Sequence, residues 1–371
     1  MRTLPPDDPT LTLFSILRED GTADPQHDAF LPRETLLAMY GQMLRIRRID
    51  ERMLGKQRQG KVGFYGTITG QEATPVATGL SLAPEDWVFP ALREAAVMLV
   101  RGFPLSTWLA QVYGNEADIL KGRQMPSHQS GRAVNQVAWS SCIGPQIPQA
   151  VGAAMAAKAR GDRSVSVGFM GDGATSQPDF HAAMTMAGIH RPPVVLICQN
   201  NHWSISVPTE KQTASATLAV KAHAYGLRGV RVDGNDVLAV HHVVKEAVDR
   251  ARDGGGPTFI ESLTYRMGPH SSSDDPTRYR SQEEVETWAK RDPIARLERY
   301  LRTAEILDDA TLEGLEAGIR AELDAALAEV EELGPPARAT VFEDVFAALP
   351  PHLQRQQAQF LAMPPAQLAH H

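Results

Sequence analysis

An acidic residue between two glycines ends an apolar run in the stretch SVSVGFMGDGATSQPDF. The acidic residue is Asp172, and its neighbours are Gly171 and Gly173. A carboxylate supplies a hard oxygen ligand, which suits Mg²⁺ or Ca²⁺ better than zinc. Glycines let phosphate oxygens approach the backbone closely, because they carry no Cβ atom. Taken alone, however, the stretch is explained more simply as a tight turn after a strand.

A second polar group ends the next apolar run, PPVVLICQNN, at Asn200 and Asn201. One strand–helix–strand crossover of about thirty residues separates the two runs, the length expected for neighbouring parallel strands. Ligands of such sheets bind beyond the carboxyl ends of the strands. Mg²⁺ takes few protein ligands and completes its shell with water and substrate phosphates. The two motifs together therefore predict a site for a hard cation and a phosphate group.

The elements that position these residues are strands alternating with helices. Near-continuous apolar runs predict buried strands at 164–170, 193–199, 229–232 and 257–263. Helical spacing predicts helices at 32–60, 148–160, 179–188, 214–225 and 237–252, and another that Asp308 and Asp309 cap. A short strand that turns into a helix is predicted at 86–100, with Arg93 near the turn. The pattern predicts an α/β fold: a doubly wound, mostly parallel sheet with helices on both faces, plus C-terminal helices.

The chain ends differ in composition from this middle part. Residues 1–30 are rich in Pro, Asp and Thr, which favours an extended arm rather than a core element. We expect one main domain over 31–345, including the C-terminal helices, and a tail over 346–371.

Composition excludes several classes of function. The net charge is −7 and there is no long basic run, which argues against nucleic-acid or anionic-membrane partners. The longest apolar stretches are too short to span a bilayer, and the N-terminus has no secretory signal pattern. Both cysteines, Cys142 and Cys198, have apolar neighbours in the sequence, so we expect buried reduced thiols and a cytoplasmic protein.

The motifs also carry a family resemblance. GDG followed by NN resembles the thiamine diphosphate motif, and the chain is similar to the alpha subunit of the branched-chain 2-oxo acid dehydrogenase decarboxylating component. The similarity begins near residue 63 and runs through FYGTITGQEA, LREAAVMLVRGFP, YGN, KGRQMP, QIPQAVGAA, RVDGNDV and YRMGPHSSSDDPTRYRS. It implies the thiamine diphosphate-binding fold, decarboxylation of branched-chain 2-oxo acids and acylation of the lipoyl domain of an acyltransferase. It also implies a beta subunit in an α₂β₂ heterotetramer.

The resemblance implies specific roles for residues. Mg²⁺ is bound by the side chains of Asp172 and Asn201 and the main-chain carbonyl of Trp203. The implied contacts of thiamine diphosphate are Arg93, Ser141, Ile143, Gly171, Asp172, Gly173, Ala174, Asn201, Trp203, Ile205 and His270. Ile143 and Ile205 are also residue types that any core contains. Phe64 and Tyr65 are implied to line the acyl pocket, with a packed aromatic pair as the open alternative for Tyr65.

A long polar segment after Arg266 carries the implied catalytic histidine, His270. A solvated loop histidine is the alternative for a residue of this kind. Arg266 and Asp274 are expected to order the segment, and Tyr279 and Arg280 are further candidates for that role. Ser271 and Ser281 match positions that are phosphorylated in some relatives.

The chain departs from the family pattern at four positions. Leu92 replaces a tyrosine and Gln199 an arginine, each on the diphosphate side of the site. Cys142 and Pro145 replace residues near a potassium site, and the proline removes a hydroxyl ligand.

The resemblance also indicates what this chain does not supply. Formation of the reactive ylid needs a glutamate, which the resemblance places on the beta subunit. Glu72, in TGQEA, is instead expected to be a helix-start carboxylate. We therefore predict that the chain binds half of the cofactor and is inactive alone.

Two other functions stay open at this point. One is a pyruvate or acetoin dehydrogenase alpha subunit of the same family, because the partner shares the substrate pocket. The other is a non-catalytic domain that binds a Mg²⁺–nucleotide at the same strand edge. A substrate comparison separates the first from the branched-chain enzyme, and thiamine diphosphate binding separates the second.

Overall fold

The centre of the fold is a parallel sheet. The computed structural model describes residues 4–24, 31–94, 96–271 and 274–364, and within them the main sheet has the strand order β1-β2-β3-β7-β6. Every pairing in it is parallel. The strands are β1 Trp87–Phe89, β2 Ser166–Gly171, β3 Val194–Asn200, β6 Arg228–Asp233 and β7 Thr258–Leu263. A small antiparallel pair, β4 Trp203–Ser204 and β5 Val207–Pro208, follows β3.

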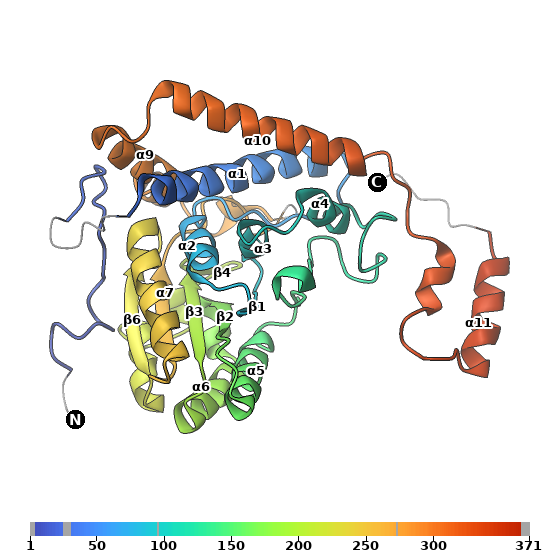
Figure 1. Ribbon diagram of the computed structural model, residues 1–371, viewed down its shortest axis with the longest axis horizontal. Helices are drawn as coiled ribbons and strands as arrows, with labels where there is room; N and C mark the ends of the chain where they lie inside the picture. Colours follow the sequence, from blue (N-terminus) through green and yellow to red (C-terminus); the bar gives the residue numbers. More distant parts are fainter. Residues whose placement is uncertain (1–3, 25–30, 95, 272–273, 365–371) are drawn as a thin grey trace.

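Helices cover both faces of this sheet. On one face, Phe169 and Ile197 pack in a buried cluster with α2 Ala73–Ser81 and α7 Val237–Arg252. On the other, Leu196 and Phe259 pack with α5 Gln146–Arg160 and α6 Pro178–His190. Successive strand residues point to opposite faces, so a strand buried on both sides reads as a continuous apolar run. The predicted doubly wound α/β sheet is confirmed (Figure 1).

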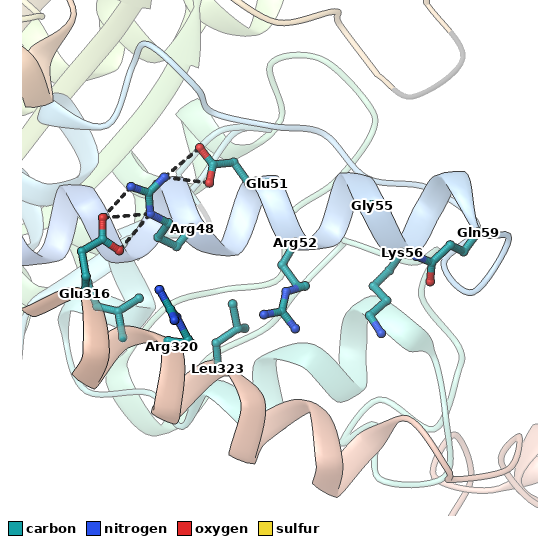
Figure 2. A pocket seen from close by; sticks show the side chains of 10 residues that line it. Arg48, Glu51, Arg52, Gly55, Lys56, Gln59, Glu316, Arg320 and Leu323 are labelled. Atoms are coloured by element: carbon teal, nitrogen blue, oxygen red, sulfur yellow. Dashed lines mark hydrogen bonds and ion pairs between the residues drawn. The ribbon is translucent and has the colours of Figure 1, made fainter. Parts of the chain in front are cut away.

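A second helical layer packs beyond α2. It contains α1 Arg33–Arg58, α9 Pro293–Thr303 and α10 Asp309–Val330, and α1 and α10 run side by side (Figure 1). Figure 2 shows Arg48 of α1 between Glu51 of the same helix and Glu316 of α10, bonded to both carboxylates. The side chain of Asp308 accepts a hydrogen bond from the Thr311 N–H, which confirms the predicted cap.

Further short helices complete the described chain. These are α3 Ala96–Val100, α4 Leu105–Tyr113, α8 Gln282–Ala289 and α11 Pro351–Ala362, with 3₁₀ turns η1 Arg132–Val134, η2 Asp172–Ser176, η3 Thr209–Lys211, η4 Ala219–Tyr225, η5 Pro276–Arg278 and η6 Arg338–Phe342. The helix predicted at 214–225 is therefore wrong in extent and type, because only η4 forms there. None of the described helices has the length and apolar character needed to cross a membrane.

The N-terminal segment contributes to the core, contrary to the expectation for 1–30. Ile16 and Leu17 are buried, and Phe14 forms a parallel bridge with Val232 of β6. The Asp236 carboxylate accepts hydrogen bonds of 2.6 Å from the N–H groups of Ile16 and Leu17. Residues 11–17, LTLFSIL, contain five apolar side chains, a local signal that the Pro-, Asp- and Thr-rich composition of the whole segment concealed.

Candidate functional site

The two polar motifs meet at one edge of the sheet, as predicted. Asp172 directly follows β2 and Asn201 directly follows β3. These strands are neighbours, and Gly171 is opposite Gln199 in their register. Both strands run in the same direction, so their carboxyl ends lie at the same edge.

A cavity of about 400 Å³ at this edge collects most of the predicted site residues. The predicted residues that line it are Phe64, Arg93, Ser141, Ile143, Gly171, Asp172, Gly173, Ala174, Asn201, Trp203, Ile205, Arg266 and His270. Residues that the sequence analysis missed also line it, among them Glu94, Met125, His128, Trp139, Gln146 and Ser204. The first residues of η2, rather than the first turn of α6, face the cavity.

The carboxylate of Asp172 is buried without a cationic partner. Its Oδ2 accepts hydrogen bonds from the Thr209 hydroxyl at 3.1 Å and the Gln212 amide at 2.9 Å. No lysine or arginine among the described residues forms an ion pair with it, and burial raises the pKa of the carboxyl. A bound cation would compensate the cost of burying this charge.

Asn201 and Trp203 present further oxygen atoms to the same cavity. The Asn201 Oδ1 accepts from the Trp203 N–H at 3.2 Å, and because a backbone N–H can only donate, this contact distinguishes the amide oxygen from the nitrogen. The Nδ2 donates to Gln71 Oε1 at 3.0 Å. The Trp203 carbonyl accepts from Arg266 Nη1 at 3.2 Å and retains a second lone pair. With Asp172, these atoms form a set of hard oxygen ligands.

Arg93 and His270 are in contact at the cavity wall. The guanidinium of Arg93 is buried and donates to the carbonyls of Thr67 and His270. Its Nη2 also lies 3.4 Å from His270 Nδ1. Arginine can only donate, so this ring nitrogen accepts and the imidazole proton is on Nε2. Burial and the charges of Arg93 and Arg266 lower the pKa of His270 to about 4, so the ring is neutral at physiological pH.

The polar segment that carries His270 is held by the residues predicted to order it. Asp274 Oδ2 accepts from the His270 N–H at 2.7 Å and from the Tyr279 hydroxyl at 2.5 Å. Arg266 donates to the Ile205 carbonyl and to Tyr279 Oη, both at 2.7 Å. Arg280 donates to three consecutive carbonyls at the start of the segment. His270 is thus a fixed residue of the cavity rather than a solvated loop histidine.

The two glycines beside Asp172 are needed for different reasons. A Cβ atom added at Gly171 would meet no atom within 4 Å, because this residue faces the cavity. A Cβ atom at Gly173 would overlap Ser204 Oγ and lie 2.9 Å from Ser204 Cβ. Gly171 therefore leaves room for a ligand, whereas Gly173 leaves room for β4.

Apolar side chains are exposed around the cavity. Ile143 is 59% exposed and Ile205 is 54% exposed, so neither is a core residue. Cys142, next to Ile143, is exposed as well, which contradicts the prediction of a buried thiol; Cys198 is buried as predicted. Cys142 and the nearby Ser140 line the cavity. Ser141 is fixed beside it by a hydrogen bond to His128 Nε2.

The aromatic pair in the glycine loop separates into two environments. Phe64 lines the cavity, where its ring centroid lies 6.4 Å from that of His128. Tyr65 points into the adjoining core and donates to Asp50 Oδ1 at 2.8 Å. Tyr65 therefore does not line this cavity, and its surroundings match the packed alternative for this residue.

Glu72 does not reach the cavity. Its carboxylate is fully buried and accepts from Arg47 Nε at 2.5 Å and from the Gly70 N–H at 2.9 Å. Glu72 is at the N-cap position of α2 but makes no side-chain cap bond to that helix. It starts a helix, as expected, yet its charge is balanced by Arg47 rather than by the helix dipole.

Comparison with known proteins identifies this arrangement. The family model described as "Dehydrogenase E1 component" matches residues 40–338. The chain belongs to the dehydrogenase E1 component family. The matched range contains every residue of the cavity, so the E1 component assignment covers the whole candidate site.

Relatives within the E1 component family share most of the chain. The 3-methyl-2-oxobutanoate dehydrogenase subunit alpha of Mycobacterium tuberculosis is 42% identical over 92% of this chain and 90% of its own length. The mitochondrial 2-oxoisovalerate dehydrogenase subunit alpha 2 of Arabidopsis thaliana is 41% identical, over 87% of this chain and 69% of its own length. The mitochondrial 2-oxoisovalerate dehydrogenase subunit alpha of Bos taurus is 39% identical over 92% of this chain and 75% of its own length.

The predicted resemblance to branched-chain 2-oxo acid dehydrogenase alpha subunits is thereby confirmed. The function predicted with it, an alpha subunit of a 2-oxo acid dehydrogenase decarboxylating component, is supported over a non-catalytic nucleotide-binding domain. The motif KGRQMP, which ends two residues before His128, was an available signal for the cavity residues that were missed.

Proposed function

We propose that the cavity binds Mg²⁺–thiamine diphosphate and that the chain acts with a beta subunit in an α₂β₂ heterotetramer. The reaction is decarboxylation of 3-methyl-2-oxobutanoate and related branched-chain 2-oxo acids, followed by transfer of the acyl group to a lipoyl domain of an acyltransferase. The observation that carries this proposal is the convergence of Asp172, Asn201 and Arg93 on one cavity. A cytoplasmic location remains the expectation for this chain.

The residues present fit the cofactor. The uncompensated carboxylate of Asp172, the Asn201 amide oxygen and the Trp203 carbonyl would hold Mg²⁺, and Arg93 would bind the diphosphate. Thiamine diphosphate, when bound, supplies carbanion stabilisation. Ser141, Ile143 and Ile205 would then border its rings, and Phe64 the acyl side chain.

His270 would orient and donate to the reacting acyl group. Its ring is neutral at physiological pH and carries its proton on Nε2, because Arg93 faces Nδ1. Asp274 and Arg280 fix the segment that carries it. A neutral imidazole held in this way can donate a hydrogen bond and later receive a proton.

The exposed apolar side chains at the cavity support a second subunit. Ile143 and Ile205 are more than half exposed, although each lines the cavity. Exposed apolar groups clustered at a site are typical of a surface that another protein covers. Among the described residues, the lining acids are Glu94 and Asp172, each already bonded within this chain. The family resemblance implies that the glutamate that acts on the cofactor would come from the beta subunit.

A substrate comparison tests the proposed reaction. With the beta subunit, thiamine diphosphate and Mg²⁺, we expect kcat/KM for 3-methyl-2-oxobutanoate to exceed that for pyruvate by at least about tenfold, since apolar pockets discriminate by missing methyl groups. The chain alone should be inactive. Decarboxylation at a full rate by the purified chain would refute the need for a beta subunit. A preference for pyruvate or acetoin would assign the chain to those relatives instead.

Substitutions at the two glycines test where the diphosphate lies. Gly171→Ala should leave the melting temperature unchanged, because its Cβ enters open space, but weaken thiamine diphosphate binding by about tenfold or more through steric contact. Gly173→Ala should lower the melting temperature, because its Cβ overlaps Ser204. Calorimetric titration and thermal unfolding measure the two effects. Unchanged affinity in Gly171→Ala would place the diphosphate elsewhere.

A further inference from the structure

A buried carboxyl group, Glu94, forms part of the cavity wall beside the proposed diphosphate site. The side chain is 1% exposed and lines the cavity. Its Oε2 accepts from the Ala91 N–H at 2.8 Å, and its Oε1 is paired with the Gln199 amide nitrogen. Gln199 is opposite Gly171 in the sheet register, so the pair adjoins the residue that faces the ligand.

The charge of Glu94 has no direct cationic partner among the described residues. Burial raises the pKa of Glu94, and the charge of Arg93, its neighbour in the chain, opposes this shift. The Arg93 nitrogens donate to the carbonyls of Thr67 and His270 rather than to the Glu94 carboxylate. Burial raises the pKa of the Cys198 thiol in β3, and the charge of Glu94 contributes to this rise. The other charged or titratable groups that line the cavity are His128, Cys142, Asp172, Arg266 and His270.

Gln199 shows where a proton on Glu94 would be bonded. The amide oxygen, Gln199 Oε1, is buried and has no hydrogen-bond partner among the described residues. A glutamine side chain that turns by half a rotation about its last bond exchanges its oxygen and nitrogen. A protonated Glu94 would then donate to Gln199 Oε1, and the amide nitrogen would be free to donate to an anion.

We infer that Glu94 takes up a proton from solvent when the diphosphate binds, and that Gln199 is a positioning residue for that anion. The inference rests on the proposed function. An ionised carboxylate in a buried wall repels a diphosphate, whereas the neutral acid removes the repulsion and satisfies the amide oxygen. The resemblance implies an arginine at position 199 in relatives, and its positive charge would compensate the carboxylate of Glu94. In this chain, where position 199 is a glutamine, protonation of Glu94 removes the uncompensated charge instead.

Calorimetric titration tests this coupling. Thiamine diphosphate with Mg²⁺ is titrated into the cofactor-free complex of this chain and its beta subunit, in two buffers of different ionisation enthalpy. The difference in heat gives the number of protons taken up. We expect Glu94→Gln to lower this number by up to about one, and the affinity of the unmodified complex to fall with rising pH by up to about tenfold per pH unit more steeply than that of the variant.

Two further variants keep the test decisive. Gln199→Arg supplies a cation to Glu94, so it should also lose the proton uptake even if Glu94→Gln does not fold. Glu85→Gln, at an exposed position outside the cavity, is the matched control and should retain it. Unchanged proton uptake in both Glu94→Gln and Gln199→Arg would overturn the inference while leaving the cofactor site intact. Absence of binding to the unmodified complex would overturn the proposed function, and the inference with it.

Discussion

Replacing Asp172 by alanine is expected to abolish binding of Mg²⁺–thiamine diphosphate at micromolar concentrations. The carboxylate is buried at the end of β2 without a cationic partner, and its proposed role is to hold the metal that carries the diphosphate. Loss of residues that only orient metal ligands costs about 10- to 100-fold in affinity. Loss of a direct ligand should therefore cost at least about 100-fold.

The experiment compares Asp172→Ala with Asp179→Ala in the complex with the beta subunit. Asp179 is exposed at the start of α6 and does not line the cavity, so it controls for the loss of one negative charge. Fluorescence or calorimetric titration measures the affinity, and thermal unfolding of the cofactor-free proteins checks the fold. Relief of burial should leave Asp172→Ala at least as stable as the unmodified chain. Retained cofactor affinity in this variant would contradict the proposed metal site.

Replacing Arg47 by methionine is expected to destabilise the fold by about 3–5 kcal/mol, since it leaves the buried carboxylate of Glu72 without a cation. Arg47 Nε contacts Glu72 at 2.5 Å, and its Nη2 contacts Asp292 at 2.8 Å. Burial raises the pKa of Glu72, and Arg47 opposes this shift. In the unmodified chain the folded pKa of Glu72 is about 7, so below that pH the carboxyl is protonated in both folded proteins. In the variant this pKa rises further, so the loss of stability caused by the substitution should be smallest below about pH 7 and grow as the pH rises above it.

A second substitution distinguishes this mechanism from simple loss of packing. In Arg47→Met/Glu72→Gln no charge is buried at position 72, and the glutamine oxygen can still accept from the Gly70 N–H. We expect this pair to recover stability to within about 2 kcal/mol of the unmodified chain. Arg58→Met, at an exposed position of the same helix, is the control. Urea unfolding of the purified chain measures each difference. Equal destabilisation in the single and double variants would contradict the electrostatic explanation.

The comparison of sequence and structure is clearest at Asp172 and Tyr65. The position of Asp172 followed from a general rule, because residues after parallel strands meet at one sheet edge. The position of the Tyr65 side chain did not follow from such a rule. Its glycine loop has no periodicity that would show which side chain faces the cavity and which contacts Asp50. The local sequence pattern therefore predicted which residues lie at the carboxyl ends of the strands, but not which way side chains point in irregular segments.

By itself, the sequence determined the alternation of buried strands and helices, the pairing of Asp172 with Asn201, and the cap at Asp308. Each depends on neighbours within one strand–helix–strand unit or one helical turn. Only the tertiary structure decided that Glu94 and Gln199 share a cavity wall, that His128 fixes Ser141, and that Ile16 is buried. Those contacts join segments far apart in the chain, and their packing depends on how irregular loops fill the space beyond the sheet.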